Sequence, residues 1–173
     1  MTEETPPESG EELVGDRARA MVGAEVSRVS GPVTRREFQR WAAAVGDRNP
    51  LYFDAEYARA HGYRDVIAPP LYLSYATGGV VDLDALRPDG LPARSGAMVP
   101  LPKTPRLMAG GDSWEFFAPA YAGDTVTGVR RIETVEQKQG RSGPFVLVTA
   151  STTYYNQDGE VLARATDTLL ARP

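Results

Sequence analysis

The feature that most constrains the fold is a series of strand-like segments in the second half of the chain. Residues 112–120, 124–139, 144–156 and 160–172 are rich in Val, Thr, Phe and Tyr and alternate in part between apolar and polar residues, which is typical of β-strands. The turn-forming sequences YAGD, GRSGP and NQDG separate these segments. Because the connections between the last three segments are short, we expect those strands to pair as an antiparallel meander. Trp114 and Phe116 are expected in the core of the first segment.

The first half of the chain is dominated by helical patterns, of which residues 34–46 form the best specified. Thr34 and Glu37 have the spacing of a capping box, in which each side chain satisfies a free N–H group at the helix start. Apolar residues then recur every third or fourth position from Phe38 to Val45, and Gly46 is a natural end. The sequence therefore predicts a helix whose single apolar face packs on the core.

Two further helices are expected before the strands begin. Asp54 is a suitable cap for a short helix that Gly62 ends. Two prolines then precede LYLSYATGGVVDLDAL, residues 71–86, which is apolar on most sides, and a helix of that kind is usually buried. Helices followed by strands indicate an α+β fold, with an antiparallel sheet of about five or more strands wrapped around this buried helix.

The length of 173 residues predicts one domain with a tail. Residues 1–16 are rich in Pro, Glu, Ser and Thr and are expected to be a disordered tail, so residues 17–173 form the predicted single domain. Residues 87–111 are rich in Pro and Gly and are expected to be a long loop, of a length often found in lids.

Composition excludes several classes of function. The net charge of −4 offers no basic surface for nucleic acid, and no apolar run approaches the ~18 residues of a membrane span. The chain has no cysteine and a single histidine, His61, which excludes thiolate chemistry and metal sites built on several histidines. We therefore expect no cofactor and no metal, and a cytoplasmic protein without a signal peptide.

Three stretches of the sequence resemble one known family. These are GDRNPLYFD at residues 46–54, the segment around IAPPLYLSYA, and GDSWEFFAPAYAGDTVTGVRRI. Together they resemble the MaoC-like hydratases and dehydratases, and most closely the N-terminal, FAS1-like dehydratase type, over residues 20–172. The resemblance implies a hot-dog fold, in which a curled antiparallel sheet surrounds a central helix.

The resemblance also implies a reaction and a substrate class. The family are hydro-lyases that act on CoA or acyl-carrier-protein thioesters, adding water to an enoyl thioester or removing it from an (R)-3-hydroxyacyl thioester. Their active motif is D-x-N-P-x-H-x-D. In this chain Asp47, Asn49, Pro50 and Asp54 match the motif, and Tyr52 replaces the histidine.

This departure affects the chemistry, because hydration needs a base and an acid at one double bond. Asp47 and Tyr52 are the candidate catalytic residues, but a tyrosine with an ordinary pKa of ~10 is a donor rather than a base at neutral pH. The family also uses a glycine N–H at the start of the central helix to stabilise the developing enolate. Pro70 stands there and has no N–H.

The candidate substrate-binding residues are Asn49, Pro70, Leu71, Tyr72 and Tyr75. Asn49 and the two tyrosines have a plain structural alternative. Asn49 is suited to a turn, and the two tyrosines on the predicted helix are suited to the core. Asp47 equally suits a loop carboxylate bonded to backbone N–H groups, and His61 suits a helix cap.

Three hypotheses about function remain open. The chain is one half of a two-part hydratase whose intact Asp/His motif lies in a second hot-dog subunit, or an active homodimeric dehydratase, isomerase or cyclase that uses Asp47 and Tyr52. The third hypothesis is a non-catalytic acyl-thioester binding protein. A dimer of like or unlike hot-dog subunits is predicted separately, because a sheet with apolar groups on its inner face and its flank exposes too much surface as a monomer.

Overall fold

The computed structural model describes residues 12–79, 83–86, 88, 99–101 and 106–173. The strands within these residues are β1 (Glu25–Pro32), β2 (Arg106–Phe116), β3 (Thr125–Gly140), β4 (Gly143–Tyr155) and β5 (Val161–Arg172). The helices are α1 (Asp16–Arg19), α2 (Arg35–Ala44), α3 (Ala55–Ala60) and α4 (Tyr72–Ala76), with 3-10 turns η1 (Pro50–Tyr52) and η2 (Leu83–Ala85).

The described strands form one antiparallel sheet in the order β1-β3-β4-β5-β2. Strands β3, β4 and β5 are consecutive neighbours, so the predicted meander is confirmed, as are the α+β class and the number of strands. The strands β1 and β2 form the two edges of this sheet. Each pairs with a strand that is distant in sequence, since β1 lies against β3 and β2 against β5.

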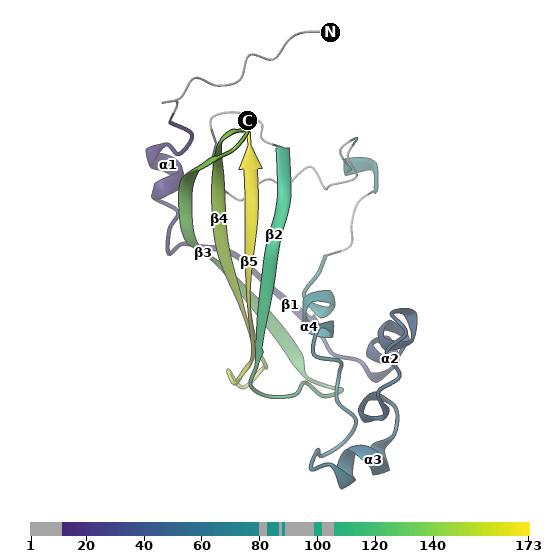
Figure 1. Cartoon of the computed structure of the whole chain (residues 1–173). Coiled ribbons are helices and arrows are strands. Elements are labelled where there is room, and N and C mark those ends of the chain that lie inside the picture. The colour runs from purple at the N-terminus through teal and green to yellow at the C-terminus, as the bar shows by residue number, and fades with distance from the viewer. Residues whose placement is uncertain (1–11, 80–82, 87, 89–98, 102–105) are drawn as a thin grey trace.

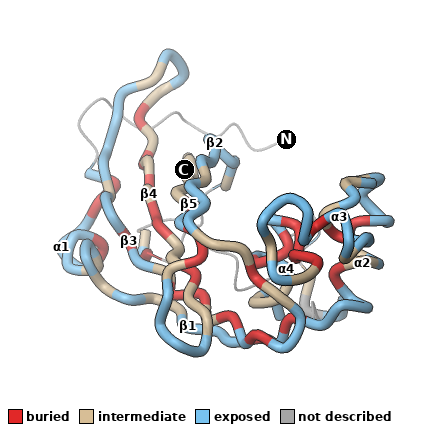
Figure 2. The backbone as a smooth tube through the Cα atoms, turned by 90° about the horizontal axis from the view of Figure 1, so that it is seen from below, coloured by how far each residue is buried: buried red, intermediate tan, exposed pale blue. Residues whose placement is uncertain are grey.

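The helices gather at opposite ends of the long sheet. Helices α2, α3 and α4 lie together at one end, α1 lies at the other, and β1 runs between them (Figure 1). The buried stretches of the backbone follow the sheet and the inner sides of α2, α3 and α4 (Figure 2). The end of the sheet that carries these three helices is therefore where a site can form between helices and strands.

Helix α2 begins at the predicted cap, but only the Thr34 half of the capping box forms, because the Glu37 carboxylate bonds to the Thr34 hydroxyl instead of its N–H. The Thr34 hydroxyl oxygen accepts the N–H of Glu37 at 3.4 Å and donates to the Glu37 carboxylate at 2.9 Å. Phe38 is fully buried, and Gly46 has a φ of +75°, a left-handed conformation that ends a helix at little cost in glycine. The helix thus ends immediately before the motif loop.

Helix α4 packs directly on the inner face of the sheet. A Cβ atom added at Gly31 of β1 would lie 1.8 Å from the carbonyl oxygen of Ala76, so the two backbones are in contact. The prediction of a long helix buried on most sides was wrong in its extent. Tyr72 and Leu73 are buried, whereas Leu71 and Tyr75 are 46% and 54% exposed, because only one side of this short helix faces the sheet.

The N-terminal segment packs earlier than predicted. Leu13 and Val14, within the predicted tail of residues 1–16, are buried in an apolar cluster with Ile132, Val146 and neighbours at the far end of the sheet. The N–H of Leu13 also donates to Gln137 Oε1 at 2.7 Å. The packed part of the chain therefore includes residue 13, and residues 1–11 lie outside the described residues.

The predicted loop of residues 87–111 needs a correction at its end. Strand β2 begins at Arg106 rather than at residue 112, because Arg106 to Ala109 pair with Arg172 to Leu169 of β5. The two glycines that follow coincide with an irregularity in the register, which glycine accommodates. Within this expected loop, residues 87, 89–98 and 102–105 lie outside the described residues.

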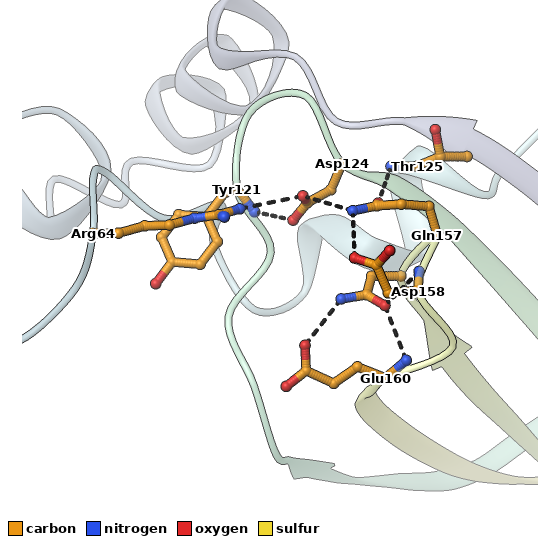
Figure 3. Close-up of polar contacts among 8 residues, drawn as sticks. Arg64, Tyr121, Asp124, Thr125, Gln157, Asp158 and Glu160 are labelled. Carbon is orange, nitrogen blue, oxygen red and sulfur yellow. Dashed lines mark hydrogen bonds and ion pairs between the residues drawn. The ribbon is translucent and has the colours of Figure 1, made fainter.

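A polar network joins three connecting segments beside the helices (Figure 3). Asp124, only 6% exposed, accepts the N–H of Tyr121 at 2.7 Å and faces the Arg64 guanidinium at 3.4 Å. The same guanidinium lies 4.0 Å above the Tyr121 ring, and Gln157 accepts the N–H of Thr125 at 3.0 Å. The network fixes the segment after α3 against the start of β3 and the β4–β5 turn.

Candidate functional site

The motif loop GDRNPLYFD is built from local hydrogen bonds. The N–H of Asp47 donates to the Ala42 carbonyl at 2.9 Å, and Asp47 Oδ1 accepts the N–H of Asn49 at 3.1 Å. Asn49 Oδ1 in turn accepts the N–H of Leu51 at 3.1 Å and so caps η1. Asp47 and Asn49 therefore have structural roles whatever else they do.

Tyr52 points inward from this loop. It is 5% exposed and belongs to the apolar cluster under the helices. Burial raises the pKa of its hydroxyl, and the neighbouring Asp47 carboxylate raises it further, while Asn49 acts in the opposite direction. The tyrosine therefore stays protonated at neutral pH and offers a hydrogen-bond donor beside Asp47, where a histidine would offer a base.

The remaining polar residues of this region have capping roles. Asp54 Oδ1 accepts the N–H groups of Glu56 and Tyr57 at 2.9 and 3.0 Å and starts α3. His61 Nδ1 lies 2.8 Å from the Tyr57 carbonyl oxygen, and its ring stacks on the Tyr57 ring at 4.0 Å. Both interpretations made from the sequence are confirmed.

An apolar pocket of about 220 Å³, which we call the proline pocket, lies beside the start of α4. Tyr63, which lines this pocket, also packs against the apolar cluster that contains Tyr52. Neither Asp47 nor Tyr52 is among the described residues of its wall. That wall consists of Tyr63, Ile67, Ala68, Pro69, Pro70, Leu73, Phe116, Phe117, Ala118, Pro119 and Ala120.

A second hollow, of about 350 Å³, lies between β1, α2 and α4, and we call it the tyrosine hollow. Tyr72 is fully buried at its base, with its ring edge-on to Phe38 and Trp41 at centroid distances of 6.1 and 6.2 Å. Burial raises the pKa of Tyr72 to about 12. The described wall consists of Pro32, Glu37, Tyr72, Tyr75, Ala76, Gly78 and Gly79.

The predicted site residues are thus divided among three places. Asp47, Asn49 and Tyr52 meet in the motif loop, Pro70 lines the proline pocket, and the tyrosines of α4 line the tyrosine hollow. Leu71 lines neither of these two cavities.

The sequence interpretation missed most residues of the cavity walls, and three of these are chemically informative. Tyr63 and Phe117 line the proline pocket, and Glu37 lines the tyrosine hollow. Phe116 was expected in the strand core but is 49% exposed, because it lies at the end of an edge strand. The hydrophobic run of residues 116–120 was the available signal for the proline pocket, whereas Glu37 was already explained as a helix cap.

The chemical groups around the proline pocket are few. Tyr63 is the ionisable residue among its described lining residues, and the two prolines at the start of α4 offer no N–H.

No group of His, Cys, Asp and Glu suited to hold a metal ion occurs in the described part of the chain. No helix within the described ranges is long and apolar enough to cross a membrane.

Comparison with known proteins identifies the family. Residues 20–165 match the model of the FAS1-like dehydratase domain region. A UPF0336 protein of Streptomyces griseus is 32% identical over 143 residues, which are 81% of this chain and 84% of that protein. A probable enoyl-CoA hydratase alpha subunit of Thermomonospora curvata is 30% identical over 85% of this chain, which spans about half of that subunit (48%).

The ChsH1–ChsH2 complex of Mycobacterium tuberculosis has a similar fold. One chain of its crystal structure superposes with a TM-score of 0.68 and 22% identity, covering 90% of this chain and 86% of that chain. The hot-dog fold implied by the sequence is thereby confirmed.

Proposed function

We propose, from the premise that this chain belongs to the FAS1-like dehydratase family of MaoC-like hot-dog proteins, that it is one half of a two-part hydratase or dehydratase. Its substrates are enoyl or (R)-3-hydroxyacyl thioesters of CoA or acyl carrier protein. A second hot-dog subunit supplies the Asp/His pair that adds hydroxide to the β-carbon and a proton to the α-carbon. The domain of residues 17–173, with the packed residues from Leu13, shapes the binding site for the acyl group.

The observation that carries this proposal is Tyr52 at the position of the motif histidine. Its hydroxyl is buried beside Asp47 and its pKa is raised, so it cannot accept a proton from water at neutral pH. Pro70 at the start of α4 adds a second deficiency, because it lacks the N–H that stabilises an enolate. Asp47 and Tyr52 then position the loop, and the proline pocket receives the thioester part of the substrate.

The edge of the sheet offers a place for the second subunit. In the described sheet β2 pairs on one side only, with β5, and an 11-residue edge strand invites pairing with another chain. Met108, Phe116 and Phe117 are 47–57% exposed on or beside this strand. The relative named as an alpha subunit and the two-component complex with the similar fold support a pairing of unlike subunits.

The test is reconstitution with a hot-dog subunit that has an intact D-x-N-P-x-H-x-D motif. We expect crotonyl-CoA hydration to be negligible for this chain alone and to appear in the pair. Asp47→Asn keeps the acceptor for the Asn49 N–H and is expected to leave turnover by the pair unchanged. The matched control is Asp→Asn in the partner's motif, which should abolish turnover.

A homodimeric enzyme is the competing outcome, and the feature that favours it is the Asp47 carboxylate, which with burial raises the pKa of the Tyr52 hydroxyl in the same loop. High hydratase activity of the purified chain, lost in Asp47→Asn, would establish that alternative and reject the two-part enzyme. Binding of acyl-CoA with no turnover in any pairing would instead identify a non-catalytic binding protein.

A further inference from the structure

The two walls of the proline pocket come from parts of the chain that are distant in sequence. One wall includes the segment between α3 and α4, and the other is the end of β2 with the residues after it. Backbone contacts join the walls, because the N–H of Ala68 donates to the Ala120 carbonyl at 2.8 Å and Ile67 forms an antiparallel bridge with Tyr121. The N–H of Ile67 also donates at 3.1 Å to the carbonyl of Leu51 in the motif loop. The wall before α4 is therefore tied both to the opposite wall and to the motif loop.

An ion pair extends this junction away from the pocket (Figure 3). In the antiparallel register set by Ile67 and Tyr121, Arg64 falls opposite Asp124. The Arg64 guanidinium lies 3.4 Å from Asp124 Oδ1 and 4.0 Å from the centroid of the Tyr121 ring. Opposite charges that face each other across paired segments stabilise the pairing. Arg64 therefore holds its own segment against the opposite wall.

Asp124 is the fixed end of this ion pair. Its side chain is 8% exposed, and Oδ2 accepts the N–H of Tyr121 at 2.7 Å. Its backbone is anchored as well, because the N–H of Val33, just before α2, donates to the Asp124 carbonyl at 2.8 Å. A carboxylate that is removed from water attracts a cation more strongly than an exposed one does. The side chain of Arg64 is 66% exposed, so its position is set from Asp124.

The residue next to Arg64 is held from another direction. Asp65 Oδ1 accepts the N–H of Val66 at 2.7 Å, and Oδ2 pairs with the Arg35 guanidinium at the start of α2. Because α2 leads into the motif loop, the two neighbouring ion pairs place the pocket wall relative to the loop and to the opposite wall.

We infer that Asp124 is a positioning residue for the thioester site, and that it acts through Arg64 on the width of the proline pocket. Asp124 is not among the described residues of the pocket wall, so it acts on a ligand through the segment that it holds. The inference rests on the proposed function, because the proline pocket is the proposed place of the thioester. Without the ion pair the wall before α4 moves away from the opposite wall, so the substrate binds more weakly while the chemistry in the partner subunit is unchanged.

Kinetics of the reconstituted pair separate positioning from catalysis. Asp124→Asn keeps an acceptor for the Tyr121 N–H and removes the charge that faces Arg64. We expect its KM for crotonyl-CoA to rise about fivefold with kcat unchanged. The matched control is Asp167→Asn, which removes a carboxylate from an ion pair of 2.6 Å with Arg130 on the sheet and should leave both constants unchanged.

Amide hydrogen exchange tests the wall directly and needs no catalysis. In Asp124→Asn the amides of Ile67 and Ala68, which bond the wall on its two sides, should exchange about fivefold faster relative to the amide of Ile132 at the far end of the sheet. Arg64→Gln leaves the buried carboxylate in place and should give the same pattern, so it tests the inference even if Asp124→Asn does not fold.

Three results would overturn the inference. The first is an unchanged KM in Asp124→Asn, and the second is an equal rise in KM in Asp167→Asn. The third is an equal rise in exchange at the wall amides and at Ile132, which would mark a general loss of stability rather than a displaced wall.

The outcomes also separate this inference from the proposed function. An active pair whose KM is the same with and without Asp124→Asn rejects the positioning role alone. If no pairing is active, calorimetric binding of crotonyl-CoA to this chain takes the place of KM. Binding that Asp124→Asn weakens then keeps the positioning role and rejects the two-part enzyme, whereas unchanged binding, or no binding at all, rejects both.

Discussion

Replacing Gly31 by alanine tests whether α4 rests on β1 as closely as the structure indicates. The added Cβ would lie 1.8 Å from the Ala76 carbonyl oxygen, whereas ordinary contacts begin at 3.4 Å, so one backbone must move by about 1.6 Å. Overpacking of this kind costs roughly 1–3 kcal/mol. At about 2–4 °C per kcal/mol for a chain of this size, Gly31→Ala should lower the melting temperature by about 2–12 °C.

The measurement is denaturant and thermal unfolding of Gly31→Ala beside Gly79→Ala. Gly79 has no atom within 4 Å of an added Cβ and no left-handed φ, so its substitution should cost little or be slightly stabilising. Because residues of α4 line both the proline pocket and the tyrosine hollow, Gly31→Ala should also weaken binding of the proposed acyl thioester. Equal stability of the two variants would refute the close packing of α4 on β1.

Three further predictions concern the helix cap, the buried tyrosines and the motif. Thr34→Ala should reduce the free energy of unfolding by about 1 kcal/mol and Thr34→Gly by only a few tenths, and equal losses in denaturant unfolding would contradict the capping role. Burial raises the pKa of Tyr52, Tyr72 and Tyr154 above that of unfolded tyrosine, so the stability they contribute is complete below about pH 10 and is lost as pH rises toward the folded pKa, about 12 for Tyr72. Denaturant unfolding at pH 9 and pH 11, with tyrosinate absorbance measured alongside, checks this loss of stability. Tyr72→Phe should make the free energy of unfolding depend less on pH. In crotonyl-CoA hydration Tyr52→His with Pro70→Gly should exceed either single change, since base and oxyanion donor act on one transition state. If the wild-type chain hydrates crotonyl-CoA and Tyr52→Phe abolishes that activity, the Tyr52 hydroxyl takes part in catalysis.

The parts of the fold set by neighbouring residues could be predicted from the sequence. The start of α2 depends on Thr34 and Glu37, which are three residues apart, and its end depends on the left-handed conformation of Gly46. The cap of α3 by Asp54 is equally local. The β3–β4–β5 meander pairs residues as distant as Thr127 and Tyr155, but short turns join its consecutive strands.

The parts set by distant contacts could not be predicted in this way. How much of α4 is buried depends on Gly31, some forty residues earlier, and the start of β2 depends on pairing with Arg172. Neither contact leaves a periodic signal in the segment concerned. The motif loop was found through its resemblance to the family, but the hollow shared by Glu37 and Tyr72 exists only once α2 and α4 have packed.

The pairing of β2 with β5 has a consequence for synthesis on the ribosome. Arg106 at the start of β2 pairs with Arg172 at the end of β5, so the sheet cannot be completed until residue 172 has left the exit tunnel. Until β5 emerges, β2 has no strand beside it in the described sheet, and its apolar side chains stay open to wrong association or to chaperones. A partner that docks on β2 would therefore recognise this edge only after β5 has paired with it, so the proposed two-part enzyme would assemble after β5 has emerged.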